Sequence, residues 1–325
     1  MTADIIDITR DPQRALTQAC TVLGDGFPVA IPTETVYGLA ADATNPAALT
    51  RIYETKGRPR FNPLICHVSD MAMAEKYASF DPISQKLAEA FWPGPLTLIL
   101  PLKTDSGIHS LATAGLDTVG MRCPMGFSSE LIRAFGKPLA APSANTSGKI
   151  SPTRAINVAD DLGNKLMLIL DDGAAAVGVE STIVKVEDGA IRLLRPGGLA
   201  AEDIERVTGL SVIRSEGPGA IIEAPGMLAS HYAPGASVRL NATDAEPGEA
   251  LLRFGGQPEG FDGVATAIFD LSPSGDLAEA ATNLFDYLKQ ADATGVMRIA
   301  IAGIPDHGLG EAINDRLARA AAPRE

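Results

Sequence analysis

The sequence predicts an α/β fold divided into two domains. In residues 1–200, short apolar runs of strand length alternate with amphipathic segments of helix length, as in a sheet flanked by helices. The same alternation returns in residues 236–325, after a stretch at 201–235 that is rich in glycine and proline. A chain of 325 residues is long enough for two domains of roughly 150 residues each. We therefore expect an N-terminal domain (1–200), a linker or lid (201–235) and a smaller C-terminal domain (236–325).

In the first domain, apolar runs predict strands at residues 28–32, 64–68, 96–100, 118–122, 138–141, 167–170, 181–186 and 191–194. Apolar positions at helical spacing predict helices at residues 12–23, 46–56, 83–91, 128–135 and 153–162. Asp188 and Gly189 separate the last two strands and favour a tight hairpin, so the sheet should be mixed rather than wholly parallel.

The second domain is expected to follow the linker. Residues 196–198 (Pro-Gly-Gly) close the first domain, and a short helix is predicted at 201–207. Six later segments repeat the strand–helix alternation: residues 237–240, 250–254, 265–270, 277–290, 299–304 and 309–321. We find no catalytic pattern in them, so the chemistry is expected in the first domain.

Composition excludes several classes of protein. Residues 1–200 carry 18 Lys and Arg against 21 Asp and Glu (net −3), and the remaining residues carry 9 against 19 (net −10), which gives −13 in all. Stable binding to nucleic acid needs a basic surface, so we expect none. No run of membrane-spanning length and no leader-like N-terminus stands out. Cys20, Cys66 and Cys123 are far apart, which predicts no disulfide or zinc site and a cytoplasmic protein.

Residues 56–64 (Lys-Gly-Arg-Pro-Arg-Phe-Asn-Pro-Leu) place three cations in a turn with two prolines. Proline fixes the backbone and cannot continue a helix, so this loop should be rigid. Arginine matches the geometry of phosphate oxygens, and lysine acts as a point charge. Alone, such a loop is more often a solvated surface turn. Together with the other motifs, it indicates a site for a polyanion.

Residues 143–148 (Ser-Ala-Asn-Thr-Ser-Gly) combine hydroxyl, amide and small side chains, which let backbone N–H groups approach an anion or a ribose closely. Other polar segments stand at the ends of predicted strands, where α/β proteins bind ligands: residues 32–39, 118–122, 180–184 and 195–198. The common phosphate-binding loop and the dinucleotide fingerprint are absent. The six segments therefore indicate a nucleoside triphosphate site of another kind.

The chain resembles the YrdC/YciO/Sua family, and specifically its threonylcarbamoyl-AMP synthases, in residues 32–39, 56–64, 143–153, 181–184 and 195–198. Pro-Gly-Met at 225–227 and His-Tyr-Ala-Pro at 231–234 resemble the linker of the two-domain members. One departure is Lys185, where the family usually has an acidic residue. The resemblance implies a YrdC-like twisted mixed sheet with flanking helices and a ligand cleft, followed by a Rossmann-like α/β domain.

The resemblance also implies an enzyme, a nucleotidyltransferase. L-Threonine and bicarbonate would give N-carboxy-threonine, whose carboxylate displaces pyrophosphate from ATP to form L-threonylcarbamoyl-AMP. Other proteins would transfer the threonylcarbamoyl group to adenosine 37 of ANN-decoding tRNAs. We expect no metal site built from side chains, and Mg²⁺ should arrive with ATP on water and phosphate ligands.

Residue roles follow from the same resemblance. Lys56, Arg58 and Arg195 would neutralise the triphosphate, the first two as the catalytic cations. Neutral groups would bind phosphate, ribose or base: Asn62, Thr118, Ser143 and Ser151. Arg122 would clamp the threonine carboxylate. The rest of the threonine would meet Thr35, His67, Ser181 and Ala141. A single histidine on an apolar strand is more often a core residue, but the resemblance favours substrate contact for His67.

The linker contains Met227, His231 and Tyr232, which a plain spacer would not need. Long irregular segments in compact proteins are often lids or binding loops. We expect residues 225–234 to fold back over the cleft, so that Tyr232 reaches ATP and water is excluded from the carbamate and the adenylate. The alternative is a passive tether between two independent domains.

Two other functions remain open from the sequence. The chain could be an RNA-binding or regulatory module that kept the fold and lost the chemistry, although its acidic balance speaks against RNA. It could also transfer a carbamoyl group to another acceptor, as hydrogenase-maturation proteins with a related domain do. Those proteins carry cysteine-rich zinc modules and an acylphosphatase-like region that this sequence lacks.

Overall fold

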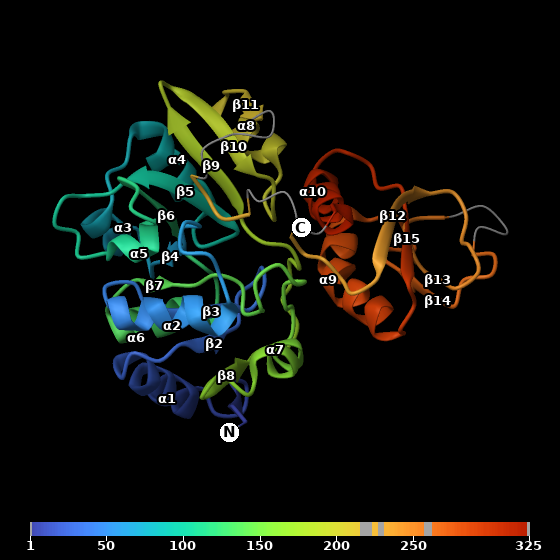
Figure 1. The fold of residues 1–325 in the computed structure, drawn as a ribbon. Helices are drawn as coiled ribbons and strands as arrows, with labels where there is room; N and C mark the ends of the chain where they lie inside the picture. The colour runs from blue at the N-terminus through green and yellow to red at the C-terminus, as the bar shows by residue number, and fades with distance from the viewer. Residues whose placement is uncertain (1, 215–222, 227–230, 257–261, 324–325) are drawn as a thin grey trace.

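The computed structural model describes residues 2–214, 223–226, 231–256 and 262–323 (Figure 1). Its strands are β1 (Asp4–Asp7), β2 (Val29–Ile31), β3 (Gly38–Asp42), β4 (Ile65–His67), β5 (Leu96–Pro101), β6 (Thr118–Arg122), β7 (Leu139–Ala140), β8 (Leu168–Asp171), β9 (Thr182–Glu187), β10 (Ala190–Arg195), β11 (Val212–Arg214), β12 (Ser237–Ala242), β13 (Glu249–Arg253), β14 (Ala267–Asp270) and β15 (Arg298–Ala302). They form a sheet of 11 strands, ordered β1-β8-β2-β3-β7-β4-β6-β5-β9-β10-β11, and a sheet of 4, ordered β12-β15-β13-β14.

The helices are α1 (Pro12–Gly24), α2 (Pro46–Lys56), α3 (Met71–Tyr77), α4 (Pro82–Phe91), α5 (Ser110–Thr113), α6 (Phe127–Phe135), α7 (Ala155–Leu162), α8 (Ala201–Thr208), α9 (Leu277–Ala293) and α10 (Leu309–Ala321). In Figure 1, α9 and α10 lie on the side of the second sheet that faces the first domain. None of the helices in the described ranges is long and apolar enough to cross a membrane.

The predicted α/β fold with a mixed sheet is confirmed. β9 and β10 are antiparallel, and their turn uses positive φ at Asp188 (52°) and Gly189 (77°), as a tight hairpin requires. β4 pairs with β6 and β5 pairs with β9 in parallel. The second sheet is wholly parallel, as in a Rossmann-like domain. β11 also pairs with β10, so the first sheet continues past residue 200 to Arg214.

The sequence analysis missed several elements, of which β3 is the most important for the site. Its residues Gly-Leu-Ala-Ala-Asp are all buried, so the segment has no alternation of apolar and polar side chains. β1 and β11 are short and lie at the two edges of the first sheet. The helices α3 and α5, of 7 and 4 residues, are too short to give a periodic signal.

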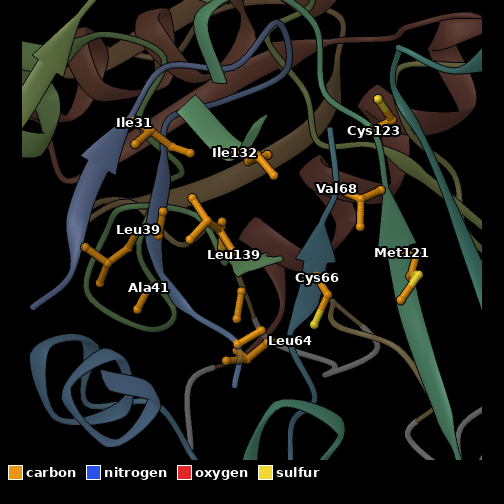
Figure 2. Packing of buried hydrophobic residues seen from close by; sticks show 14 of the residues in the cluster. Ile31, Leu39, Ala41, Leu64, Cys66, Val68, Met121, Cys123, Ile132 and Leu139 are labelled. Atoms are coloured by element: carbon orange, nitrogen blue, oxygen red, sulfur yellow. The ribbon is translucent and has the colours of Figure 1, made fainter. Parts of the chain in front are cut away.

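The core of the first domain packs side chains from neighbouring strands against the helices. Figure 2 shows Leu39 of β3, Leu139 of β7, Cys66 of β4 and Met121 of β6 within this cluster. All four are fully buried. A core of this kind holds the strand ends rigidly, which is where the polar segments of the sequence lie.

The two domains share a second hydrophobic core. Leu284 and Phe285 of α9 pack in one buried cluster with Val36, Ile150 and Val179, which belong to the first domain. Tyr232 of the linker belongs to the same cluster. The domains are therefore packed together through apolar side chains and are not joined by a loose tether.

Candidate active site

A single cavity collects most of the predicted site residues. It is bordered by the segments that follow β2 and β7, by β4, by the carboxyl end of β6, and by the segments at the start of β9 and the end of β10. Described residues of the linker complete its wall. The predicted residues that line it are Thr35, Arg58, His67, Arg122, Ala141, Ser143, Ser181, Arg195 and Tyr232.

The basic loop is not a solvated turn, because Arg58, Asn62 and Leu64 are buried while Arg60 and Phe61 are exposed. Asn45 caps the start of α2, and Gly57, with a φ of 61°, ends that helix and turns the chain into the loop. Arg58 is only 8% exposed, and its guanidinium donates to the carbonyl oxygens of Asn62 (3.4 Å) and Pro63 (3.0 Å). The loop therefore holds its own arginine in one position at the cavity.

Three buried cations at the site have no carboxylate partner within ion-pair distance among the described residues. The Lys56 Nζ donates to the carbonyl oxygens of Ser143 (2.5 Å) and Asn145 (2.6 Å). Arg58 binds carbonyls only, and Arg195 donates to the carbonyl oxygen of Ser181 at 2.8 Å. Burial lowers the pKa of Arg195, lowers that of Arg58 to about 10, and together with the charge of Arg58 lowers that of Lys56 well below its usual value.

Buried charges without counter-ions are costly to the fold. An arrangement that keeps three of them beside one cavity is suited to a ligand that carries several negative charges. The neighbouring backbone carbonyls neutralise no charge, so a polyphosphate would meet cations that are fixed and still available.

Arg122 has a different environment. Its Nη2 forms an ion pair with Glu34 at 2.6 Å, and its Nη1 donates to the hydroxyl of Thr35 at 2.8 Å. Its Nε donates to the carbonyl oxygen of Gly94. The charge of Arg122 is thus balanced by a carboxylate of the protein, which makes it a poorer partner for a triphosphate than Arg58 or Arg195.

The neutral side chains form a compact polar corner. The hydroxyl of Ser181 lies 2.8 Å from that of Thr97 and accepts from Arg195 at 3.2 Å. His67 is buried on β4, with its Nδ1 3.3 Å from the carbonyl oxygen of Ile65. Burial, and then the charge of Arg122, lower the pKa of His67 to about 3, so the ring is neutral at pH 7. A neutral imidazole can exchange hydrogen bonds with a small polar substrate.

The linker reaches the cavity and is held there by both domains. The backbone N–H of Ala233 donates to Gly148 O in the first domain, and that of His231 donates to Arg319 O in the second. Lys185 pairs with Glu187 (3.0 Å) and with Glu223 of the linker (3.4 Å), so the residue that departs from the family pattern helps to fix this segment.

Among the described residues of the linker, Tyr232 has a backbone conformation that is unusual for a non-glycine residue. It is 1% exposed and has a φ of 62°, a strained conformation for a bulky side chain. Its ring stacks on Phe285 of α9 and meets the ring of His231 at 4.1 Å between centroids. Strain of this kind persists only where the surroundings impose it, and here the buried ring is held between side chains of both the linker and α9. Met227, the other residue singled out in this segment, lies outside the described residues.

Four predicted residues do not line the cavity. Lys56 lies behind the segment 143–145, which it anchors, and Asn62 carries the carbonyl that accepts from Arg58. Ser151 is fully buried and donates to Glu180 at 2.5 Å. Thr118 stands at the beginning of β6, at the opposite end of the strand from Arg122. Their roles toward ATP stay predictions.

Glu180 is a cavity residue to which the sequence analysis gave no role. Burial raises the pKa of its carboxyl, but the charges of Arg316 and Arg195 and the hydrogen bond from Ser151 outweigh burial and hold it at about 2. The ionised carboxylate forms an ion pair with Arg316 of α10 at 2.9 Å. No group of three or more His, Cys, Asp or Glu that could hold a metal ion occurs within the described ranges.

Comparison with known proteins identifies the family. Residues 21–197 match the Sua5/YciO/YrdC family model, described as "Telomere recombination", and residues 199–322 match the "Threonylcarbamoyl-AMP synthase, C-terminal domain". Threonylcarbamoyl-AMP synthase of Bacillus subtilis is 41% identical, over 97% of this chain and 95% of its own. The chain belongs to the threonylcarbamoyl-AMP synthase family. The family member of Pyrococcus abyssi is 40% identical, over 94% of both chains.

A solved structure of the threonylcarbamoyl-AMP synthase family supports the same assignment. The crystal structure of P. abyssi Sua5 complexed with L-threonine matches with a TM-score of 0.84 at 38% identity, over 94% of each chain. The resemblance to this family that the sequence analysis drew from the motifs is thereby confirmed. The ion pairs Arg122–Glu34 and Glu180–Arg316 were missed, because their partners lie 88 and 136 residues apart and leave no local pattern.

Proposed function

We propose that this protein synthesises L-threonylcarbamoyl-AMP from L-threonine, bicarbonate and ATP, with release of pyrophosphate. The observation that carries the proposal is a cavity with a small polar corner, lined by Arg58 and Arg195 and backed by Lys56, three buried cations that have no carboxylate partner within ion-pair distance among the described residues. The family membership and the L-threonine complex of the P. abyssi relative support it.

The reaction needs two events in one site. The threonine amine first takes up bicarbonate to form N-carboxy-threonine with loss of water. A carboxylate oxygen of that carbamate then attacks the α-phosphorus of ATP, the bond to the bridging oxygen breaks, and pyrophosphate leaves with its electrons. Such a displacement depends on holding the phosphates in line and neutralising their charge, which is the role we give to Arg58, Arg195 and Lys56.

Threonine would occupy the polar corner. Its hydroxyl would exchange hydrogen bonds with Ser181 or neutral His67, and its methyl group would face the small side chain of Ala141. Its carboxylate would approach Arg122, which already shares its charge with Glu34. Because Glu34 balances the charge of Arg122, Arg122 can orient the threonine carboxylate and attracts the triphosphate less than Arg58 and Arg195 do.

Mg²⁺ would enter with ATP, bound by phosphate and water, and help to neutralise the departing pyrophosphate. The buried Tyr232 and its neighbours would keep water from the carbamate and the adenylate. The product would serve proteins that attach the threonylcarbamoyl group to N6 of adenosine 37 in tRNA. We place this chemistry in the cytoplasm.

Mass spectrometry of the product formed from ATP, bicarbonate and a panel of amino acids tests the proposal. We expect a threonylcarbamoyl adenylate, with turnover that falls modestly for serine and strongly for valine. Serine lacks one methyl contact, worth about 1 kcal/mol. Valine places a methyl group where the hydroxyl would exchange a hydrogen bond with Ser181 or His67, and sites built around a substrate hydroxyl reject such analogues strongly. Comparable turnover of valine and threonine would refute the pocket.

The two alternatives make different predictions for the same protein. A module that binds RNA without catalysis would shift tRNA in a gel and release no pyrophosphate. A carbamoyltransferase for another acceptor would form a carbamoyl adenylate from ATP and a carbamoyl donor such as carbamoyl phosphate, without threonine. The acidic balance of residues 201–325 disfavours the first, and the polar corner with Ser181 and His67 disfavours the second.

A further inference from the structure

Arg316, on α10 of the second domain, is fully buried against the cavity wall of the first domain. Its Nε donates to Glu180 Oε2 at 2.9 Å, and its Nη1 donates to the carbonyl oxygen of Pro196 at 2.7 Å. Its guanidinium carbon lies 5.4 Å from the centre of the Tyr232 ring. One side chain of the second domain therefore contacts three segments that border the cavity.

The carboxylate of Glu180 is shared between the two domains. Its Oε1 accepts a hydrogen bond from Ser151 at 2.5 Å, and its Oε2 accepts from Arg316. A buried carboxylate requires a cation within contact distance. Arg195 is also nearby, but it contacts the carbonyl and hydroxyl of Ser181 and not the carboxylate. Arg316, which also pairs with Asp315 at 2.8 Å, is thus the cation in direct contact with Glu180.

This balance matters for a substrate with several negative charges. Without Arg316, an ionised Glu180 on the cavity wall would repel the triphosphate or draw Arg195 into an ion pair. With Arg316 present, the charges of Arg58 and Arg195 at the cavity remain available for the phosphates, and Lys56 lies behind the segment 143–145. The contact with Pro196 also fixes the backbone directly after Arg195.

We propose that Arg316 is a positioning residue for ATP, through which the C-terminal domain completes the active site by neutralising Glu180 and fixing the turn after Arg195. The inference rests on the function proposed above, because it takes ATP as the ligand. The simpler account is that Arg316 only fastens one domain to the other. The two accounts differ in what happens when Glu180 also loses its charge.

The test uses the full-length protein and calorimetric titration with Mg–ATP. Arg316→Met should weaken ATP binding about tenfold or more, because it leaves a buried carboxylate near the phosphates without its cation. Steady-state kinetics should show a raised KM for ATP and a smaller change in the KM for threonine. Adding Glu180→Gln to Arg316→Met should restore most of the ATP affinity, since the amide oxygen still accepts from Ser151 and needs no cation.

Arg214→Met is the matched control. Arg214 forms a two-fold ion pair with Glu311 of α10, at 2.6 and 2.9 Å, and so links the same domains on the exposed side. This variant should leave ATP affinity unchanged. If Arg316 only fastens the domains, both arginine variants lower the melting temperature and ATP affinity, and Glu180→Gln rescues neither. That outcome overturns the proposal.

A second variant decides the matter if Arg316→Met does not fold. Arg316→Lys keeps the positive charge beside Glu180 and should retain ATP affinity within about threefold, whereas a loss of tenfold or more would contradict the charge-balancing role. The titration does not depend on the product. Failure of the wild-type protein to form threonylcarbamoyl-AMP would refute the proposed function. The ATP titrations of the Arg316 variants would still decide whether Arg316 positions ATP.

Discussion

Two arginines of one loop, Arg58 and Arg60, differ in their surroundings. Arg58 is buried at the cavity and bonded to carbonyl oxygens, whereas Arg60 is exposed. Arg58→Ala should weaken ATP binding by roughly 1.5–3 kcal/mol, the usual worth of a hydrogen bond to a charged group. Arg60→Ala should leave it unchanged. Isothermal titration with ATP checks both variants. If Arg58→Ala and Arg60→Ala both bind ATP as tightly as the unaltered protein, the loop is not part of the site.

His67 gives the protein a dependence on pH. Burial, and then the charge of Arg122, lower its pKa to about 3 in the folded state, while an unfolded histidine titrates near 6.5. Between these values the unfolded chain binds more protons, so the free energy of unfolding falls as the pH falls from about 6.5 toward 3. The loss should approach about 1.4 kcal/mol per pH unit for this residue.

Urea unfolding at pH 7, 6 and 5 measures the effect. His67→Gln should flatten the decrease, because the glutamine does not titrate. His307→Gln, which changes an exposed histidine, should keep the slope of the wild type. Identical slopes in all three proteins would show that His67 is not kept neutral by the fold. His231, whose pKa burial also lowers to about 3, should contribute a similar share.

At the residue scale, the sequence predicted which polar groups would converge and not how they are paired. Polar segments next to strands gather at one place because the sheet brings strand ends together, so Thr35 and Ser181 could be found by pattern. The partners of Arg122 and Arg316 could not, because an ion pair between distant segments depends on the final packing. Burial of Lys56 at a helix end, where lysine is usually exposed, was missed for the same reason.

Helices and strands could be predicted from the sequence where only one of their faces is buried. The hairpin of β9 and β10 carries a turn signal, and α9 has its apolar face marked along its length. β3 is buried on both faces and built from small residues, so its sequence resembles a loop. This strand nevertheless fixes the segment between Thr33 and Gly38 that borders the cavity.

Contact between the domains includes a tightly packed segment at Gly178. Its φ is 80°, and a Cβ added there would lie 2.3 Å from the carbonyl oxygen of Ala281 and from Cα of Thr282 on α9. The same segment donates from Gly178 N to the carbonyl oxygen of Thr35 at the cavity. α9 therefore packs directly on the backbone that supports the site.

Gly178→Ala should destabilise the protein by several kcal/mol and weaken ATP binding, because α9 would have to move. Gly173→Ala is the matched control, since Gly173 has a similar φ of 75° and nothing within 4 Å of an added Cβ. It should cost only the backbone strain, about 1–2 kcal/mol. Chemical unfolding and ATP titration compare the two. Equal losses would mean that strain, and not contact with α9, accounts for the effect.

For the whole molecule, the shared core suggests how the protein unfolds. Val36, Ile150 and Val179 of the first domain are buried together with α9 side chains of the second, and the buried pair Glu180–Arg316 joins the same faces. Separating the domains would expose this apolar surface and leave a buried charge without its partner. The sequence, with its glycine- and proline-rich linker, gave no sign of this coupling.

We therefore expect the domains to unfold in one transition despite the length of the chain. Differential scanning calorimetry should show a single peak, with equal calorimetric and van't Hoff enthalpies. ATP at 100 times its Kd should shift the peak upward, since it stabilises the folded state by about 2.7 kcal/mol. Gly178→Ala should divide the peak into two, because it loosens α9 from the first domain, whereas Gly173→Ala should keep one. Two peaks in the unaltered protein would show that each domain is stable alone. The shared core and the Glu180–Arg316 pair would then not couple the unfolding of the two domains.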